Sequence, residues 1–118
     1  MLSRPLRFIA ISFMALTLGA CATKNPPLYS WQGYQANLDA YFRASSLSPD
    51  AQAQKMEQDL QKIQVAGLSV PPGYHAHLGL LYAEQGDLDK FAQQVALEKS
   101  KFPESQPFMD FLLRNFKK

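Results

Sequence analysis

The chain has 118 residues, of which 12 are Lys or Arg and 10 are Asp or Glu, so its formal net charge is +2. Two of the basic residues, Arg4 and Arg7, belong to a predicted export leader, and without them the basic and acidic residues balance. A neutral domain with no stripe of Lys and Arg lacks the electrostatic footprint of a nucleic-acid-binding protein, and residues 21–118 suffice for only one small domain.

The first 20 residues have the pattern of an export signal. A basic start is followed by an apolar stretch of 11 residues, Phe8–Leu18, and then by the small residues Gly19 and Ala20. As a helix, this stretch would span roughly 16 Å, about half the hydrocarbon thickness of a bilayer. It is too short for a permanent transmembrane anchor, so we expect residues 1–20 to be removed.

The end of this leader, Leu18-Gly19-Ala20-Cys21, resembles the lipobox of bacterial lipoproteins. The resemblance implies that the Cys21 thiol receives a diacylglycerol, that the leader is cleaved before Cys21, and that the new amine takes a further acyl chain. One acyl chain gives only reversible membrane binding, whereas two or three make a lasting anchor. Residues 21–29 would then form a lipidated tether, and residues 22–28 can reach at most about 25 Å.

Cys21 is the only cysteine of the chain. With a single cysteine, the chain can form neither an internal disulfide nor a metal site of several thiolates. The alternative to a lipoprotein is a soluble secreted protein with a cysteine after its signal. Lipid attachment is the stronger interpretation because the single thiol stands where that modification needs it.

From Ser30 onward the apolar periodicity is helical, which predicts an all-α domain of five helices over residues 30–118. Ser30 is the expected cap of the first helix, which should end near Ser45. The apolar face of this helix comprises Trp31, Tyr34, Leu38, Tyr41 and Phe42. These aromatic residues, with Tyr29, could form a ligand or glycan platform, but helical spacing favours a core. Tyr29 and Trp31 could also touch lipid headgroups.

Ser48-Pro49-Asp50 predicts the start of the second helix, with a Ser cap, Pro at the first helical position and an acid in the first turn. Gly67 and the prolines that follow should close it. Its apolar stripe comprises Ala53, Met56, Leu60 and Ile63.

Residues 72–86 read as a third helix that ends at Gly86, and Asp87 should cap a fourth helix. The two helices should form a hairpin, with Pro103 ending the second of them. Here the chain resembles a tetratricopeptide repeat, because Leu78, Gly79 and Tyr82 follow the spacing L-G-x-x-Y. Glycine at this point would let the two helices cross closely. The apolar stripe of the fourth helix comprises Leu88, Phe91, Val95 and Phe102.

The match to the repeat is incomplete. Phe91, with Ala92 beside it, stands where the repeat usually has a small Ala, and His75 replaces a bulky apolar residue. One repeat cannot bury its own apolar face, so it needs neighbours on both sides. The first two helices can supply one neighbour, and a C-terminal capping helix after Pro107 can supply the other. Apolar residues occupy more than one face of that last helix, so part of it can stay exposed for a partner: Phe108, Met109, Phe111, Leu112, Leu113 and Phe116.

Three stretches, residues 28–31, 71–82 and 98–113, are similar to an uncharacterised family of proteobacterial lipoproteins that carry a domain of unknown function. Members commonly travel with two other lipoproteins, one of which resembles the curli-secretion channel. The resemblance implies a shared cell-envelope assembly and brings no catalytic residues. Ala22 after Cys21, rather than Asp, is what outer-membrane sorting allows by the rule known for enteric bacteria.

The only histidines, His75 and His77, invite a metal-site hypothesis. Helix positions two apart point roughly 200° away from each other, whereas a metal pair on a helix needs i and i+4 spacing. Structural or partner-facing imidazoles are the better interpretation, and we expect no metal and no cofactor. The acids near the predicted helix boundary could pair as in a glycosidase, but capping and solvation explain them better: Glu84, Asp87 and Asp89.

We therefore expect a non-enzymatic outer-membrane lipoprotein, held in the membrane by lipid on Cys21 and facing the periplasm, whose helical domain binds another envelope protein. A curli-secretion-channel-like lipoprotein is a candidate partner, and nucleic acid is not expected. The competing interpretation is an envelope enzyme or ligand-binding factor that uses His75 and His77 with nearby carboxylates. The expected partner-binding residues are Tyr74, His75, His77, Phe108, Met109, Phe111 and Leu112.

Overall fold

The computed structural model describes residues 4–5, 25–43 and 46–116. Cys21 and most of the expected leader lie outside the described residues. In the described stretches from residue 25 to residue 116 the regular structure is entirely helical, which confirms the all-α prediction and its five α-helices: α2 (Tyr34–Phe42), α3 (Pro49–Val65), α4 (Tyr74–Glu84), α5 (Leu88–Lys101) and α6 (Gln106–Phe116). A short 3-10 helix, η2 (Pro103–Ser105), precedes α6. Among the described residues, none of the helices has the length and apolar character needed to cross a bilayer.

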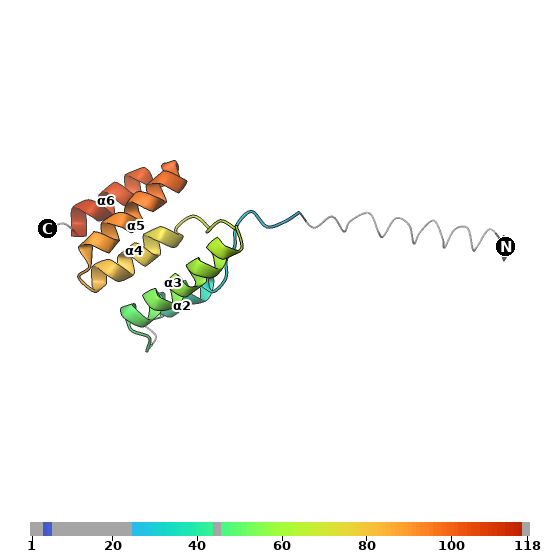
Figure 1. The fold of residues 1–118 in the computed structure, drawn as a ribbon, viewed down its shortest axis with the longest axis horizontal. Coiled ribbons are helices and arrows are strands. Elements are labelled where there is room, and N and C mark those ends of the chain that lie inside the picture. Colours follow the sequence, from blue (N-terminus) through green and yellow to red (C-terminus); the bar gives the residue numbers. More distant parts are fainter. Residues whose placement is uncertain (1–3, 6–24, 44–45, 117–118) are drawn as a thin grey trace.

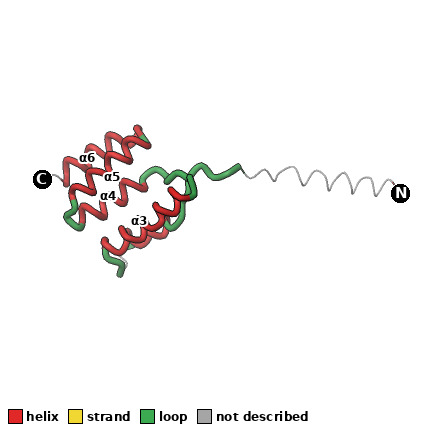
Figure 2. Tube along the Cα trace, viewed as in Figure 1, coloured by secondary structure: helices red, strands yellow, loops and turns green. Residues whose placement is uncertain are grey.

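Each helix packs against the next one along the chain, and the contact between α4 and α5 is the most extensive. Figure 1 shows α4, α5 and α6 side by side, with α2 and α3 as a second group. Figure 2 shows the loop that joins α3 to α4 running between these two groups. The fold therefore has two helical groups, and residues 66–73 connect them.

The predicted helix ends are largely confirmed by backbone and side-chain hydrogen bonds. Ser48 caps α3 because its Oγ accepts from Ala51 N at 3.2 Å, and Asp87 caps α5 because its Oδ1 accepts from Lys90 N at 3.1 Å. Gly67 and Gly86 have φ of 67° and 80°, which glycine adopts without a steric penalty. At both glycines the following residue donates back to a carbonyl five positions earlier, a Schellman motif that closes α3 and α4.

The first helix begins later than Ser30, so the predicted cap is wrong. Ser30 N donates to Ser69 O at 2.8 Å, and Gln32, two residues later, has a φ of 38°, outside the helical region, so the helix starts only after it. Gly33 occupies the N-cap of α2, and Tyr34 is its first residue. Two residues expected on its core face are exposed, Trp31 by 46% and Phe42 by 78%, because Trp31 precedes the helix and Phe42 ends it.

The core lies where α3, α4 and α5 meet, with contributions from α2 and α6. Gly79 of α4 faces α5 at close range, since a Cβ built there would lie 3.2 Å from Gln94 Cβ and 3.5 Å from the backbone oxygen of Phe91. Tyr82, on the same helix, is buried and donates through its hydroxyl to Glu57 of α3. The Gly79 position thus allows the close α4–α5 crossing, whereas Tyr82 ties α4 to α3.

Candidate functional site

The C-terminal helix α6 carries apolar residues on two faces, one packed against the core and the other exposed to solvent. Met109 and Leu112 are 1% and 7% exposed and belong to the core. Phe108 and Phe111 are 55% and 52% exposed, and their rings stack with centroids 6.4 Å apart. Of the four residues on this helix that the sequence predicted to contact a partner, only Phe108 and Phe111 are therefore at the surface.

The three predicted contact residues on α4 are inside the fold, which corrects the expectation that they face a partner. Tyr74 is fully buried, and its hydroxyl donates to Met56 O at 2.6 Å. His75 and His77 are 2% and 5% exposed. The structural interpretation of the imidazoles therefore replaces the partner-facing one, since neither ring can reach an external protein without local opening of the helix packing.

The two imidazoles point to different elements, as their spacing predicted. Nδ1 of His75 lies 2.7 Å from Gln94 Oε1 on α5, whereas the ring of His77 packs edge-on against Tyr41 of α2 at 5.0 Å. Burial lowers the pKa of both histidines, because a buried imidazole loses the hydration that stabilises its charged form. Among the described residues, no group of three His, Cys, Asp or Glu is placed to hold a metal ion.

The acids near the α4–α5 turn also serve separate local contacts. Glu84 Oε1 accepts from the Tyr41 hydroxyl at 2.6 Å, and this hydrogen bond is the main cause that raises the pKa of Tyr41 to about 12. Asp87 caps α5, as expected, and Asp89 lies exposed in the first turn of that helix. Glu84 and Asp87 thus each make a separate structural contact, and Asp89 faces solvent. Capping accounts for Asp87.

The most unusual carboxylate is Glu98 of α5, which the sequence analysis did not single out. It is 2% exposed, and its two oxygens accept from Gly73 N at 2.6 Å and from Ala76 N at 3.3 Å. It therefore caps the N-terminus of α4 from a neighbouring helix, where a negative charge is favoured by the helix dipole. The sequence feature that could have indicated a buried Glu98 is its spacing, because it falls three positions after Val95 on the apolar stripe of α5.

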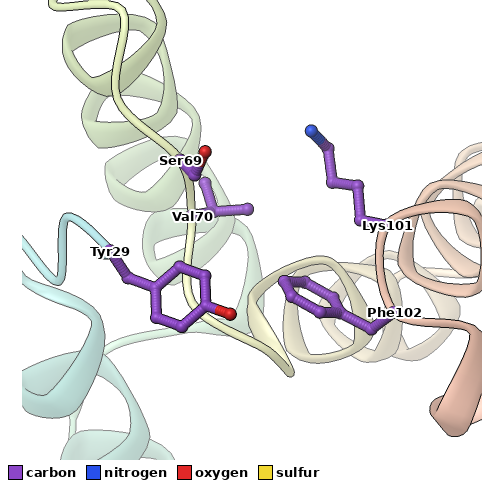
Figure 3. Close-up of a pocket in the computed structure, with 5 residues that line it drawn as sticks. All are labelled: Tyr29, Ser69, Val70, Lys101 and Phe102. Carbon is purple, nitrogen blue, oxygen red and sulfur yellow. The ribbon is translucent and has the colours of Figure 1, made fainter.

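A surface hollow of about 240 Å³ lies where the N-terminal segment meets the loop between α3 and α4 and the end of α5. Figure 3 shows the Tyr29 ring beside Phe102, with Ser69 and Val70 above it and Lys101 across the opening. The rings of Tyr29 and Phe102 meet edge-on at 6.1 Å. A second hollow of about 230 Å³ shares Val70 and Lys101 with the first and is also lined by His75. Both hollows are small, and they mark the junction of the two helical groups.

Comparison with protein families decides what this chain is related to. The family described as "Domain of unknown function (DUF4810)" matches residues 28–112. This chain belongs to the DUF4810 family. No curated protein matches it, and neither does any solved structure.

The DUF4810 match runs from Leu28 to Leu112, so it includes all of α2 to α5 and most of α6. It also includes Tyr29, Glu98 and both exposed phenylalanines of α6. The features of this DUF4810 domain described above therefore lie within the family's span, and the matched family carries no described activity.

Proposed function

We propose that this DUF4810 protein is a non-enzymatic lipoprotein, anchored by lipid on Cys21 at the periplasmic face of the outer membrane, that binds another envelope protein. The lipobox-like Leu18–Cys21 and Ala22 support the anchor and its location. The short stretch from Cys21 to Leu28 would keep the helical domain within about 25 Å of the anchor.

The domain itself is proposed to be tetratricopeptide-like. Each helix packs on its successor, the α4–α5 hairpin is closed by Gly86, and Gly79 lies against α5. In such stacks the last helix covers the open apolar face of the final hairpin. Met109 and Leu112 of α6 do this here, so α6 is the proposed capping helix.

The observation that carries the binding function is the pair Phe108 and Phe111. A capping helix usually presents a polar outer face, because nothing further packs on it. On α6 two stacked aromatic rings, each more than half exposed, occupy that position. Exposed aromatic side chains are typical anchors of protein–protein interfaces. The resemblance to lipoproteins that travel with a curli-secretion-channel-like protein makes such a protein the first candidate partner.

The test is a pull-down from detergent-solubilised envelopes with the wild-type chain and a Phe108→Ser, Phe111→Ser double variant. Deleting α6 would be a poor test because it also removes Met109 and Leu112 from the core. Phe42→Ser is the matched control, since Phe42 is an exposed aromatic residue on α2.

We expect one specific envelope protein to be captured by the wild type and by the Phe42 variant, and to be lost from the double variant. Circular dichroism should show equal helix content in all three chains. Capture of the same protein by all three would refute the role of the α6 pair. Capture of no protein by any of them would refute the binding function.

A further inference from the structure

The N-terminal segment does not simply leave the domain; it is fixed to the loop that follows α3. Ser30 is 8% exposed, and its amide donates to Ser69 O at 2.8 Å. Tyr29 reinforces this attachment through its edge-on contact with Phe102 at 6.1 Å. Residues 28–31 and 65–70 therefore lie together at the junction of the two helical groups, and Figure 1 shows the described chain before residue 28 leading away from this junction.

This junction exposes large apolar side chains on both of its segments. Leu28 and Trp31, two residues before and one after Ser30, are 77% and 46% exposed. Val65 and Leu68, four residues and one residue before Ser69, are 90% and 46% exposed. All four lie within four positions of Ser30 or Ser69 in the chain, and the hydrogen bond between these two serines brings their segments together, so we treat the four side chains as one surface. We call it the tether-proximal surface.

The length of chain beyond this surface indicates what covers it. Only residues 22–27 separate Leu28 from Cys21, and even fully extended they reach at most about 25 Å. If Cys21 carries the lipid, the tether-proximal surface is the part of the domain held nearest to the bilayer. Tryptophan favours the interface between lipid and water, and lysine is attracted to anionic headgroups. Trp31 is on this surface, and Lys101 lines the adjoining hollow (Figure 3).

We propose that the tether-proximal surface of Leu28, Trp31, Val65 and Leu68 docks on the lipid bilayer, with these side chains among the headgroups and Lys101 facing lipid phosphates. The inference deepens the proposed function and rests on the lipid attachment at Cys21. It adds that the membrane contacts the folded domain as well as the tether. Docking would also set the orientation of the domain and thereby the direction in which α6 faces.

Trp31 makes the contact measurable because it is the only tryptophan of the chain. The chain from Cys21 onward is isolated in its natural form and reconstituted in vesicles of phosphatidylethanolamine and phosphatidylglycerol. We expect the Trp31 emission to shift to shorter wavelength. Lipids brominated on their acyl chains should quench it, and aqueous iodide should lose most of its access to it. The Val65→Ser, Leu68→Ser variant should lose most of this quenching, whereas Phe42→Ser, which changes an exposed residue of α2, should keep it.

A second arm separates this inference from the anchor itself. The unlipidated chain is coupled through the Cys21 thiol to maleimide-bearing phospholipids, so that the tether is attached whatever the natural modification. Mass spectrometry of the natural product reports independently on that modification. Quenching by brominated lipid in both arms supports the inference. If the natural product is not acylated but the coupled chain is still quenched, the lipid anchor is refuted and the docking surface is supported.

Equal quenching in the wild type and in the Val65, Leu68 variant would overturn the inference, as would a Trp31 that stays fully accessible to iodide on vesicles. Protection of Trp31 that requires high protein density and no lipid would assign the surface to a second copy of the chain. That result would overturn the inference too.

Discussion

Glu98 offers the sharpest test of how the start of α4 is held against α5. Its carboxylate is buried on α5 and accepts hydrogen bonds from two amides at the start of α4, Gly73 N and Ala76 N. Glu98→Gln keeps the size and shape of the side chain. It removes the charge and replaces one acceptor oxygen by an amino group that donates toward a backbone donor.

The expected loss follows from these contacts. A hydrogen bond to a charged group contributes about 1.5–3 kcal/mol, and a neutral one about 0.5–1.5 kcal/mol. The substitution removes one charged hydrogen bond and weakens the other, and it also loses an interaction with the helix dipole of about 0.3–1 kcal/mol. Glutamine is less costly to bury than a carboxylate, which offsets part of the loss. We therefore expect the free energy of unfolding to fall by about 2–4 kcal/mol.

The assay is urea unfolding followed by circular dichroism and by Trp31 fluorescence. Glu104→Gln is the matched control because Glu104 is an exposed glutamate in η2, and its effect should stay within about 0.5 kcal/mol. In a domain of this size the Glu98 variant should also melt roughly 8–30 °C lower. A loss below about 1 kcal/mol with an unchanged denaturant slope would show that Gly73 and Ala76 find other acceptors, and would refute the reasoning.

Three further predictions follow from other contacts. Gly79→Val should destabilise the domain by about 2–3 kcal/mol, because the added methyl groups meet α5. The control Ala96→Val, at an exposed site of α5, should cost under about 1 kcal/mol. Thermal melting of the two variants compares these losses. Ser48→Ala should cost about 1 kcal/mol in urea unfolding by removing the cap of α3, and an effect near zero would contradict that role. Burial lowers the pKa of His75 and His77 below the usual 6.5, so the unfolded chain binds more protons and stability should fall as the pH drops through 6.5. His77→Phe should flatten this dependence in urea titrations at neutral and mildly acid pH, and an unchanged slope would exclude His77 as a source.

Local signals in the sequence were enough to determine the helices from α3 onward. Ser48 and Asp87 act as caps and Gly67 and Gly86 as stops because each satisfies backbone groups within its own turn. Such interactions depend on residues a few positions apart, so spacing alone reveals them. The absence of a side chain at Gly79 likewise indicated a close crossing, although not which atoms of α5 would approach it.

The late start of α2 depended on tertiary structure. Ser30 has the chemistry of a helix cap, but its amide bonds to Ser69, 39 positions later in the chain. This bond holds the segment beside the α3–α4 loop, and the turn at Gln32, whose φ is 38°, delays the helix until Tyr34; the spacing of nearby residues reveals neither feature. Trp31 was therefore expected in the core, and the structure places it on the tether-proximal surface.

The sequence by itself determined that the domain is all-helical, where most of its helices end, and that α6 carries more apolar residues than one face can bury. Only the tertiary structure decided which of them are hidden. Helical periodicity defines a face but not its neighbour, so Tyr74, His75 and His77 looked like candidate contact residues until α2, α3 and α5 were seen to enclose them. For the same reason Glu98 became visible as a cap only when the start of α4 was placed beside it.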